Sequence, residues 1–145
     1  MNKKILTNVF LPLLPGMAVM LATTGDSVKI YNIPAGTVEA CSYFTLLPVT
    51  NMQMVTPLAA MLAVAALIFA LVYVFTGKTW CVRGVLYTAV LSTCAAACPN
   101  LMRSEIMVAP NVLFPILMAV LSFLAYRVGK KAESKTVAPR LDIKH

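Results

Sequence analysis

Four long apolar stretches constrain the fold of this chain more than any other feature of its sequence. They cover residues 5–24, 57–76, 85–102 and 110–128, and apart from Arg127 near the end of the last they contain no Lys, Arg, Asp, Glu or His. A helix of about 17–25 apolar residues crosses the hydrocarbon core of a bilayer. The sequence therefore predicts an all-α membrane protein, a bundle of four transmembrane helices.

The overall composition supports this fold class. Hydrophobic residues make up 60% of the chain and charged residues 12%, against about 45–50% and about 25% in soluble domains. A chain of 145 residues has no room for a separate catalytic domain, since soluble domains commonly need about 100–150 residues. We expect a transmembrane domain over residues 1–128 and a basic, disordered tail over residues 129–145.

The first apolar stretch has an alternative interpretation as a signal peptide. Lys3 and Lys4 precede it, and the small residues Ala22, Thr23 and Thr24 close it. The stretch is longer than the apolar region of a signal peptide, which spans about 7–15 residues, and Ala22-Thr23-Thr24 makes a poor cleavage site. We expect this segment to remain as a helix, with bends at Pro12 and Pro15.

The distribution of cations predicts the orientation in the membrane. Ten of the 12 Lys and Arg residues fall on the side of the N-terminus: Lys3, Lys4, Lys78, Arg83, Arg127, Lys130, Lys131, Lys135, Arg140 and Lys144. Lys29 and Arg103 fall on the other side. The positive-inside rule therefore predicts a multi-pass protein of the cell membrane with both termini in the cytoplasm and the loop of residues 25–55 outside.

The formal net charge of +7 raises the question of a nucleic-acid partner. Six of the 12 cations lie at or beyond the end of the last apolar stretch, from Arg127 onward, and no aromatic residue lies beyond Tyr126 to stack on bases. We therefore expect no nucleic-acid partner. The expected partners are the lipid bilayer and another membrane protein or a second copy of the chain.

Small residues predict how the helices pack. They recur at helical spacing in the second stretch (Ala59, Ala63, Ala66 and Ala70) and in the third (Ala89, Ser92 and Ala96). Helices in lipid associate where small residues let their backbones approach closely. We expect these two helices to form a tight antiparallel pair across a short turn at residues 78–84. Methionines such as Met17, Met20, Met61 and Met118 are interpreted as core or lipid-facing side chains rather than metal ligands.

The outer loop carries two β-prone runs, residues 27–33 and 37–43, on either side of Pro34-Ala35-Gly36. This pattern predicts a hairpin-like loop, which must rest on the membrane or on the helix ends because an isolated hairpin is marginal in water. The candidate anchors at the headgroup boundary are Tyr43, Phe44, Leu46, Leu47 and Met52.

Four cysteines are the most reactive candidates in the chain. The topology puts Cys41 outside, Cys94 and Cys98 near the outer end of the third helix, and Cys81 at the cytoplasmic turn. Three alternatives remain open: a catalytic dithiol, a structural bridge from Cys41 to Cys94 or Cys98, and free thiols. A helical i,i+4 pair suits a disulfide poorly unless Pro99 ends the helix.

No other group of residues in the sequence predicts a reaction. The one histidine, His145, is the last residue and lies far from every cysteine, so no zinc pattern exists. Five polar residues within the helices could line a polar path, although bonding to nearby backbone is the preferred interpretation: Asn8, Thr88, Ser92, Thr93 and Asn111. We assign no catalytic, cofactor-binding or metal-ligating residue and expect no cofactor.

The segment that precedes the second helix carries a resemblance. Ser42-Tyr43-Phe44, followed by Leu46 and Pro48 and then by a Pro-initiated apolar helix and a short basic turn, resembles small four-span bacterial membrane proteins. The similarity covers roughly residues 20–125. It implies this architecture and no activity.

These observations together predict a non-enzymatic accessory or assembly component of a membrane complex. The alternatives are a membrane thiol-disulfide oxidoreductase, which would use the outer cysteines, and a small transporter subunit, which would use the polar residues within the helices.

Overall fold

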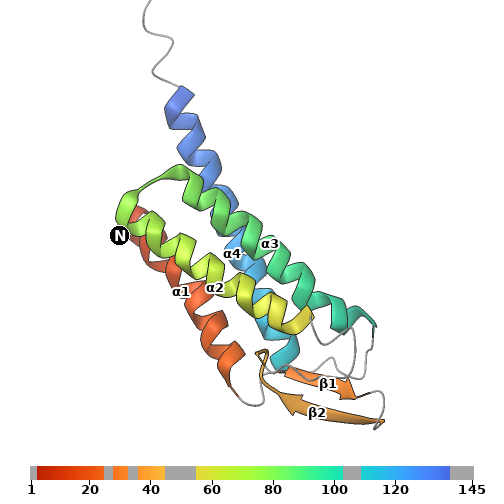
Figure 1. Ribbon diagram of the computed structural model, residues 1–145. Helices are drawn as coiled ribbons and strands as arrows, with labels where there is room; N and C mark the ends of the chain where they lie inside the picture. Colours follow the sequence, from red (N-terminus) through yellow and green to blue (C-terminus); the bar gives the residue numbers. More distant parts are fainter. Residues whose placement is uncertain (1–2, 25–27, 33–35, 45–54, 103–108, 138–145) are drawn as a thin grey trace, which may run out of the picture.

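The computed structural model describes residues 3–24, 28–32, 36–44, 55–102 and 109–137. Its elements, in chain order, are α1 (Lys3–Thr23), β1 (Val28–Asn32), β2 (Thr37–Cys41), α2 (Val55–Thr76), α3 (Thr79–Met102) and α4 (Ala109–Val137). The helices lie side by side as a four-helix bundle, and the strands lie at one end of it (Figure 1). The predicted fold class is confirmed.

Each helix packs against its two neighbours in a ring, α1 against α2, α2 against α3, α3 against α4 and α4 against α1. The contacts that α3 makes with α2 and α4 are the most extensive. Within the described residues three helical segments are long and apolar enough to cross a membrane, Val55–Thr76, Thr79–Cys98 and Val112–Ala132, while the apolar segment Asn8–Thr23 of α1 is shorter. The chain is a helical membrane protein.

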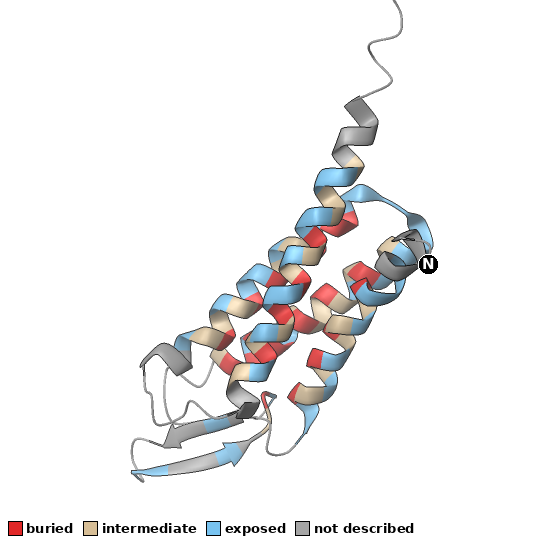
Figure 2. Cartoon of the chain, turned by 180° about the vertical axis from the view of Figure 1, so that it is seen from behind, coloured by how far each residue is buried: buried red, intermediate tan, exposed pale blue. Residues whose placement is uncertain are grey.

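One spacing of buried residues recurs in all four helices. Intervals of four, three and four residues separate Leu11, Pro15, Ala18 and Ala22 in α1; Ala59, Ala63, Ala66 and Ala70 in α2; Val85, Ala89, Ser92 and Ala96 in α3; and Phe114, Met118, Leu121 and Ala125 in α4. This is the interval of helices that cross at small angles and interlock along one seam. Figure 2 shows the buried residues on the inner sides of the helices.

The small-residue stripes of α2 and α3 belong to this core, so the predicted tight pair is confirmed. The helices pack tightly at Gly84, where an added Cβ would lie 2.9 Å from the Phe69 ring. The methionines behave as expected, since Met118 is buried, and Met17, Met20 and Met61 are exposed.

The turn between α2 and α3 is shorter than expected. Gly77 has a φ of 66°, and its N–H donates to the Tyr73 carbonyl at 2.8 Å, which is the usual way for glycine to end a helix. The Lys78 carbonyl already accepts from the Cys81 N–H at 3.2 Å. The third helix therefore begins at Thr79 and not at residue 85. Gly84 is the one residue of 79–84 that disfavours a helix, and it is accommodated because it packs against the Phe69 ring.

The fourth helix ends later than expected. It continues past residue 128 to Val137, so residues 129–137 of the expected disordered tail are helical, whereas residues 138–145 lie outside the described part of the chain. Gly129 does not end the helix, because good helix formers follow it, among them Lys130, Lys131, Ala132 and Glu133. No proline lies between Gly129 and Pro139.

The hairpin forms as predicted. β1 and β2 pair antiparallel, with Val28 opposite Cys41 and Asn32 opposite Thr37. Gly36 lies at the turn with a φ of 64°, a conformation that glycine adopts without steric cost. The hairpin lies at the end of the bundle opposite the α2–α3 turn (Figure 1).

Candidate functional site

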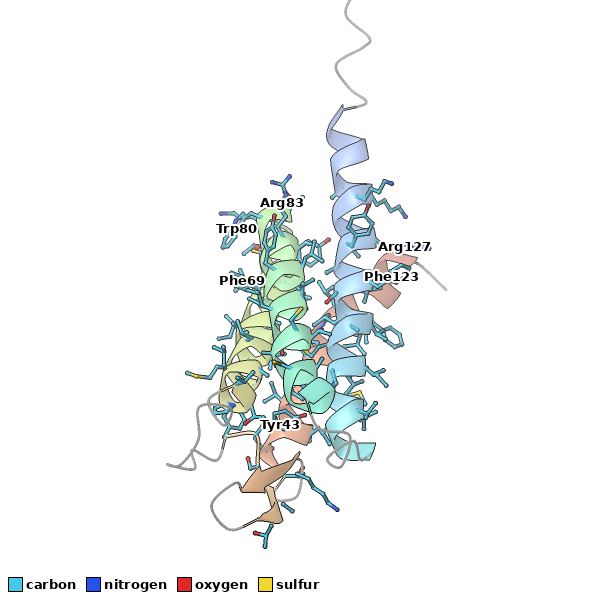
Figure 3. The ribbon with its side chains drawn as sticks, turned by 90° about the vertical axis from the view of Figure 1, so that its right-hand side faces the viewer. Tyr43, Phe69, Trp80, Arg83, Phe123 and Arg127 are labelled. Carbon is cyan, nitrogen blue, oxygen red and sulfur yellow. The ribbon has the colours of Figure 1, made fainter. Side chains whose placement is uncertain are left out.

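Tyr43 is the feature of the outer end that differs most from the sequence prediction. It was expected at the headgroup boundary, but its side chain is only 1% exposed. Its ring stacks on Phe114 of α4, with 4.5 Å between ring centroids. Tyr43 is therefore a core residue, and Figure 3 shows it at the hairpin end of the bundle.

The end of α1 explains why Tyr43 is drawn inward. The last carbonyls of a helix have no partner within it. The Ala22 carbonyl accepts hydrogen bonds from the Tyr43 N–H at 3.2 Å and from the Ser42 hydroxyl at 2.9 Å. The Ser42 hydroxyl also accepts from the Phe44 N–H at 3.1 Å. The chain after β2 thus caps α1 and carries the tyrosine ring into the bundle.

This arrangement has an electrostatic consequence. Burial raises the pKa of the Tyr43 phenol above its ordinary range, because a phenolate would lose its hydration. The side chain therefore stays neutral at any physiological pH. Phe44 remains partly exposed and can still serve as a boundary anchor, whereas Leu46, Leu47 and Met52 lie outside the described residues.

The structure separates the cysteines by environment. Cys94 and Cys98 are free and exposed, and Cys81 is free and buried. Cys81 lies within α3 and not in a turn, because the helix starts earlier than expected. The side chain of Cys41 is outside the description, but the free state of Cys94 and Cys98 means that neither is bridged to it here.

The two exposed thiols lie one helical turn apart on α3. The helix continues through Pro99 to Met102, so Pro99 does not end it and does not release the two cysteines from helical geometry. Residues four apart in a helix have Cβ atoms about 5–6 Å apart, whereas a disulfide needs about 3.5–4.5 Å. A bond between Cys94 and Cys98 would therefore require local unwinding.

The hydroxyl groups of α3 bond to the backbone. Thr88 donates to the Gly84 carbonyl at 2.7 Å, and Thr93 donates to the Ala89 carbonyl at 2.8 Å. Ser92 instead bonds across the helix interface, to the Ala59 carbonyl of α2 at 2.8 Å. The preferred interpretation of these three residues is confirmed. Asn8 is exposed, and the side chain of Asn111 is outside the described residues.

Cations and aromatic rings gather at the end opposite the hairpin. Lys78, Arg83, Arg127, Lys130 and Lys131 are exposed. The Arg127 guanidinium lies 4.9 Å from the centroid of the Phe123 ring. The Trp80 ring packs edge to face on Phe69, with 6.1 Å between the ring centroids. Figure 3 shows Trp80 and Arg83 at this end of α3 and Arg127 on α4.

Within the described residues, no group of three or more His, Cys, Asp and Glu side chains is placed to hold a metal ion. Comparison with protein-family models, with curated proteins and with solved structures finds no match.

Proposed function

We propose that this chain is a non-enzymatic accessory or assembly component of a membrane complex, which acts through its outer surface. The observation that carries the proposal is the interior of the bundle. Apolar side chains fill its seam in all four helices, and the buried Ser92 hydroxyl is bonded to the Ala59 carbonyl. The surface that remains for recognition is the outward side of the helices.

The first helix is the element best suited to meet a partner. Its contacts with α2 and α4 are less extensive than those that α3 makes. Its outward side presents large flexible side chains, among them Met17 and Met20 at 48% and 73% exposure. Methionine adapts to irregular surfaces, so this side can pack against another membrane helix.

A photo-crosslinking amino acid placed at Met20 tests the proposal in the native membrane. We expect one discrete protein adduct and, after extraction in mild detergent, a particle of defined stoichiometry larger than the 15.6 kDa chain. Ala18, buried on the opposite side of α1, is the matched control. Lipid adducts alone at Met20, together with a monomeric mass, would contradict an assembly role; a co-purified permease would indicate a small transporter subunit.

The proposed orientation has both termini in the cytoplasm. It is supported by the arrangement of the bundle, in which the start of α1, the α2–α3 turn and the end of α4 lie at one end (Figure 1). Most cations of the sequence belong to these segments.

Impermeant thiol labelling checks this orientation. In a background without the native cysteines, Ser27→Cys should react in intact cells and Ser134→Cys only after permeabilisation, because the two positions lie on opposite sides of the membrane. Labelling of Ser134→Cys in intact cells would reverse the assignment.

A thiol-disulfide oxidoreductase is the second candidate, favoured by the exposure of Cys94 and Cys98. In such a reaction one thiolate attacks a partner's disulfide, forms a mixed disulfide and releases one partner thiol. The helical separation of the two sulfurs opposes resolution by the other cysteine. Cells that carry Cys94→Ala or Cys98→Ala alone should show no trapped adduct; a discrete adduct that disappears in the double variant would establish the oxidoreductase instead.

A further inference from the structure

The outward face of α4 changes character abruptly along its length. Intervals of three, four, three, four and three residues place on one face Leu113, Ile116, Val120, Phe123, Arg127 and Lys130, all of them exposed. The first four are large and apolar, and the last two are cations. This face therefore passes from lipid-like to charged between Phe123 and Arg127, within one helical turn.

Three cations cluster directly beyond this change. Lys130 and Lys131 lie three and four residues after Arg127, so their side chains leave the helix on the same side and about one turn above it. The Arg127 guanidinium lies over the Phe123 ring at 4.9 Å, which holds the charge at the edge of the apolar face.

The cations of the neighbouring helix α3 lie at the same height along the bundle as those of α4. The position of a Cβ on Gly129 would be 3.8 Å from Val82 of α3, which sets these two residues at the same height. Arg83 and Lys130 each follow one of them in sequence, so the cations of α3 and α4 lie at one level of the bundle. Trp80, an amphipathic side chain typical of membrane interfaces, is exposed near this level.

We propose that the Arg127, Lys130 and Lys131 turn of α4 is a binding site for the headgroup of an anionic phospholipid. The acyl chains would lie along the apolar part of the face, from Leu113 to Phe123, while the phosphate meets the three cations. An acidic soluble protein would match the charge but not the continuous apolar face below it. A zwitterionic lipid would bring its own cation toward the three side chains, so the site favours a headgroup of net negative charge.

Native mass spectrometry of the full chain in detergent, titrated with phosphatidylglycerol or phosphatidylcholine, tests the site. The Arg127→Gln, Lys130→Gln, Lys131→Gln variant should bind phosphatidylglycerol about five-fold more weakly for each cation removed. Its weak binding of phosphatidylcholine should not change. The charge-matched control is Lys29→Gln, Arg140→Gln, Lys144→Gln, which should keep the preference for phosphatidylglycerol because Lys29 lies on the hairpin and the other two follow Lys131 by nine or more residues in the sequence.

Each outcome decides the proposal. Equal binding of both lipids by the wild-type chain, or unchanged phosphatidylglycerol binding by the triple variant, would overturn it. An equal loss of phosphatidylglycerol binding in the control variant would mean that only the net charge of the chain matters. Loss of a bound protein with unchanged lipid binding would mean that the cations bind an acidic protein. If the triple variant fails to fold, two other measurements decide. Phosphatidylglycerol binding at this site must weaken in the Arg127→Gln variant, and in the wild-type chain it must weaken as the salt concentration rises.

Discussion

At the scale of single residues, small side chains and one hydroxyl hold α2 and α3 together. The Ser92 hydroxyl bonds from α3 to the Ala59 carbonyl of α2, and Gly84 packs tightly against the Phe69 ring of α2. Both effects depend on position rather than on hydrophobicity. A serine or glycine elsewhere in the bundle, such as Ser122 or Gly129, does not have the same role.

Ser92→Ala should lower the free energy of unfolding, because the Ala59 carbonyl loses a donor from outside its own helix. Hydrogen bonds between membrane helices contribute about 0.6 kcal/mol on average and at most about 1.7 kcal/mol. Thermal unfolding in detergent measures the change. Ser122→Ala is the control, because Ser122 donates to the Met118 carbonyl of its own helix; an equal loss in both variants would show that the bond between the helices adds nothing.

Gly84→Ala should destabilise the bundle by about 1–3 kcal/mol, the usual cost of overpacking. The new Cβ would meet the rigid Phe69 ring at 2.9 Å, so the ring or the helix must move. Gly129→Ala adds the same methyl group at ordinary contact distance, 3.8 Å from Val82, and should leave the midpoint of thermal unfolding almost unchanged. If the two variants unfold alike, α2 and α3 are farther apart than described.

At the scale of elements, each helix has one buried seam with the same intervals of four and three residues, but different side chains fill it. Alanines line the seam of α2, whereas Phe114, Met118 and Leu121 fill that of α4. Small side chains bring α2 close to α3, and large ones fill the centre between the helices. The hairpin, in contrast, holds its place through the residues that follow it.

Ala63→Leu and Ala66→Leu should each destabilise the bundle by about 1–3 kcal/mol, because both positions are fully buried at close helix contacts. Met61→Leu, at 65% exposure on the outward side of α2, is the matched control and should have little effect. Unfolding in detergent ranks the variants. The reverse order would mean that the alanine stripe faces lipid.

At the scale of the whole molecule, Tyr43 joins the outer loop to the bundle. Its ring packs against α4 while its backbone caps α1, so one residue connects three parts of the chain. By its contacts with α1 and α4, Tyr43 holds the loop over one end of the bundle. The exposed cations of α3 and α4 lie at the other end. The two ends of the molecule therefore differ in both charge and structure.

Tyr43→Ala should cost about 3–5 kcal/mol, as other buried aromatic truncations do, and should free the outer loop from α1. Phe44→Ala, at the adjacent and partly exposed position, should cost much less. Limited proteolysis of the outer loop together with thermal unfolding measures both effects. Equal protease sensitivity of the two variants would contradict a specific role for the tyrosine.

The sequence by itself determined the number of helices, the α2–α3 pair and the hairpin. Bilayer thickness requires long apolar helices, small residues at helical spacing mark close contacts, and β-prone runs on either side of Pro34-Ala35-Gly36 favour a turn. These are local signals, and each is complete within one segment of the chain. The ten cations that the sequence analysis assigned to the side of the N-terminus likewise indicated which end of the bundle would be basic.

Only the tertiary structure decided the remaining features, because they depend on contacts between distant segments. Tyr43 looks like a boundary aromatic in sequence and becomes a core residue because the Ala22 carbonyl needs a donor. Gly129 was expected in the disordered tail but lies within α4, beside Val82 of α3. The level of Arg127, Lys130 and Lys131 relative to α3 follows from that same contact, which no local pattern encodes.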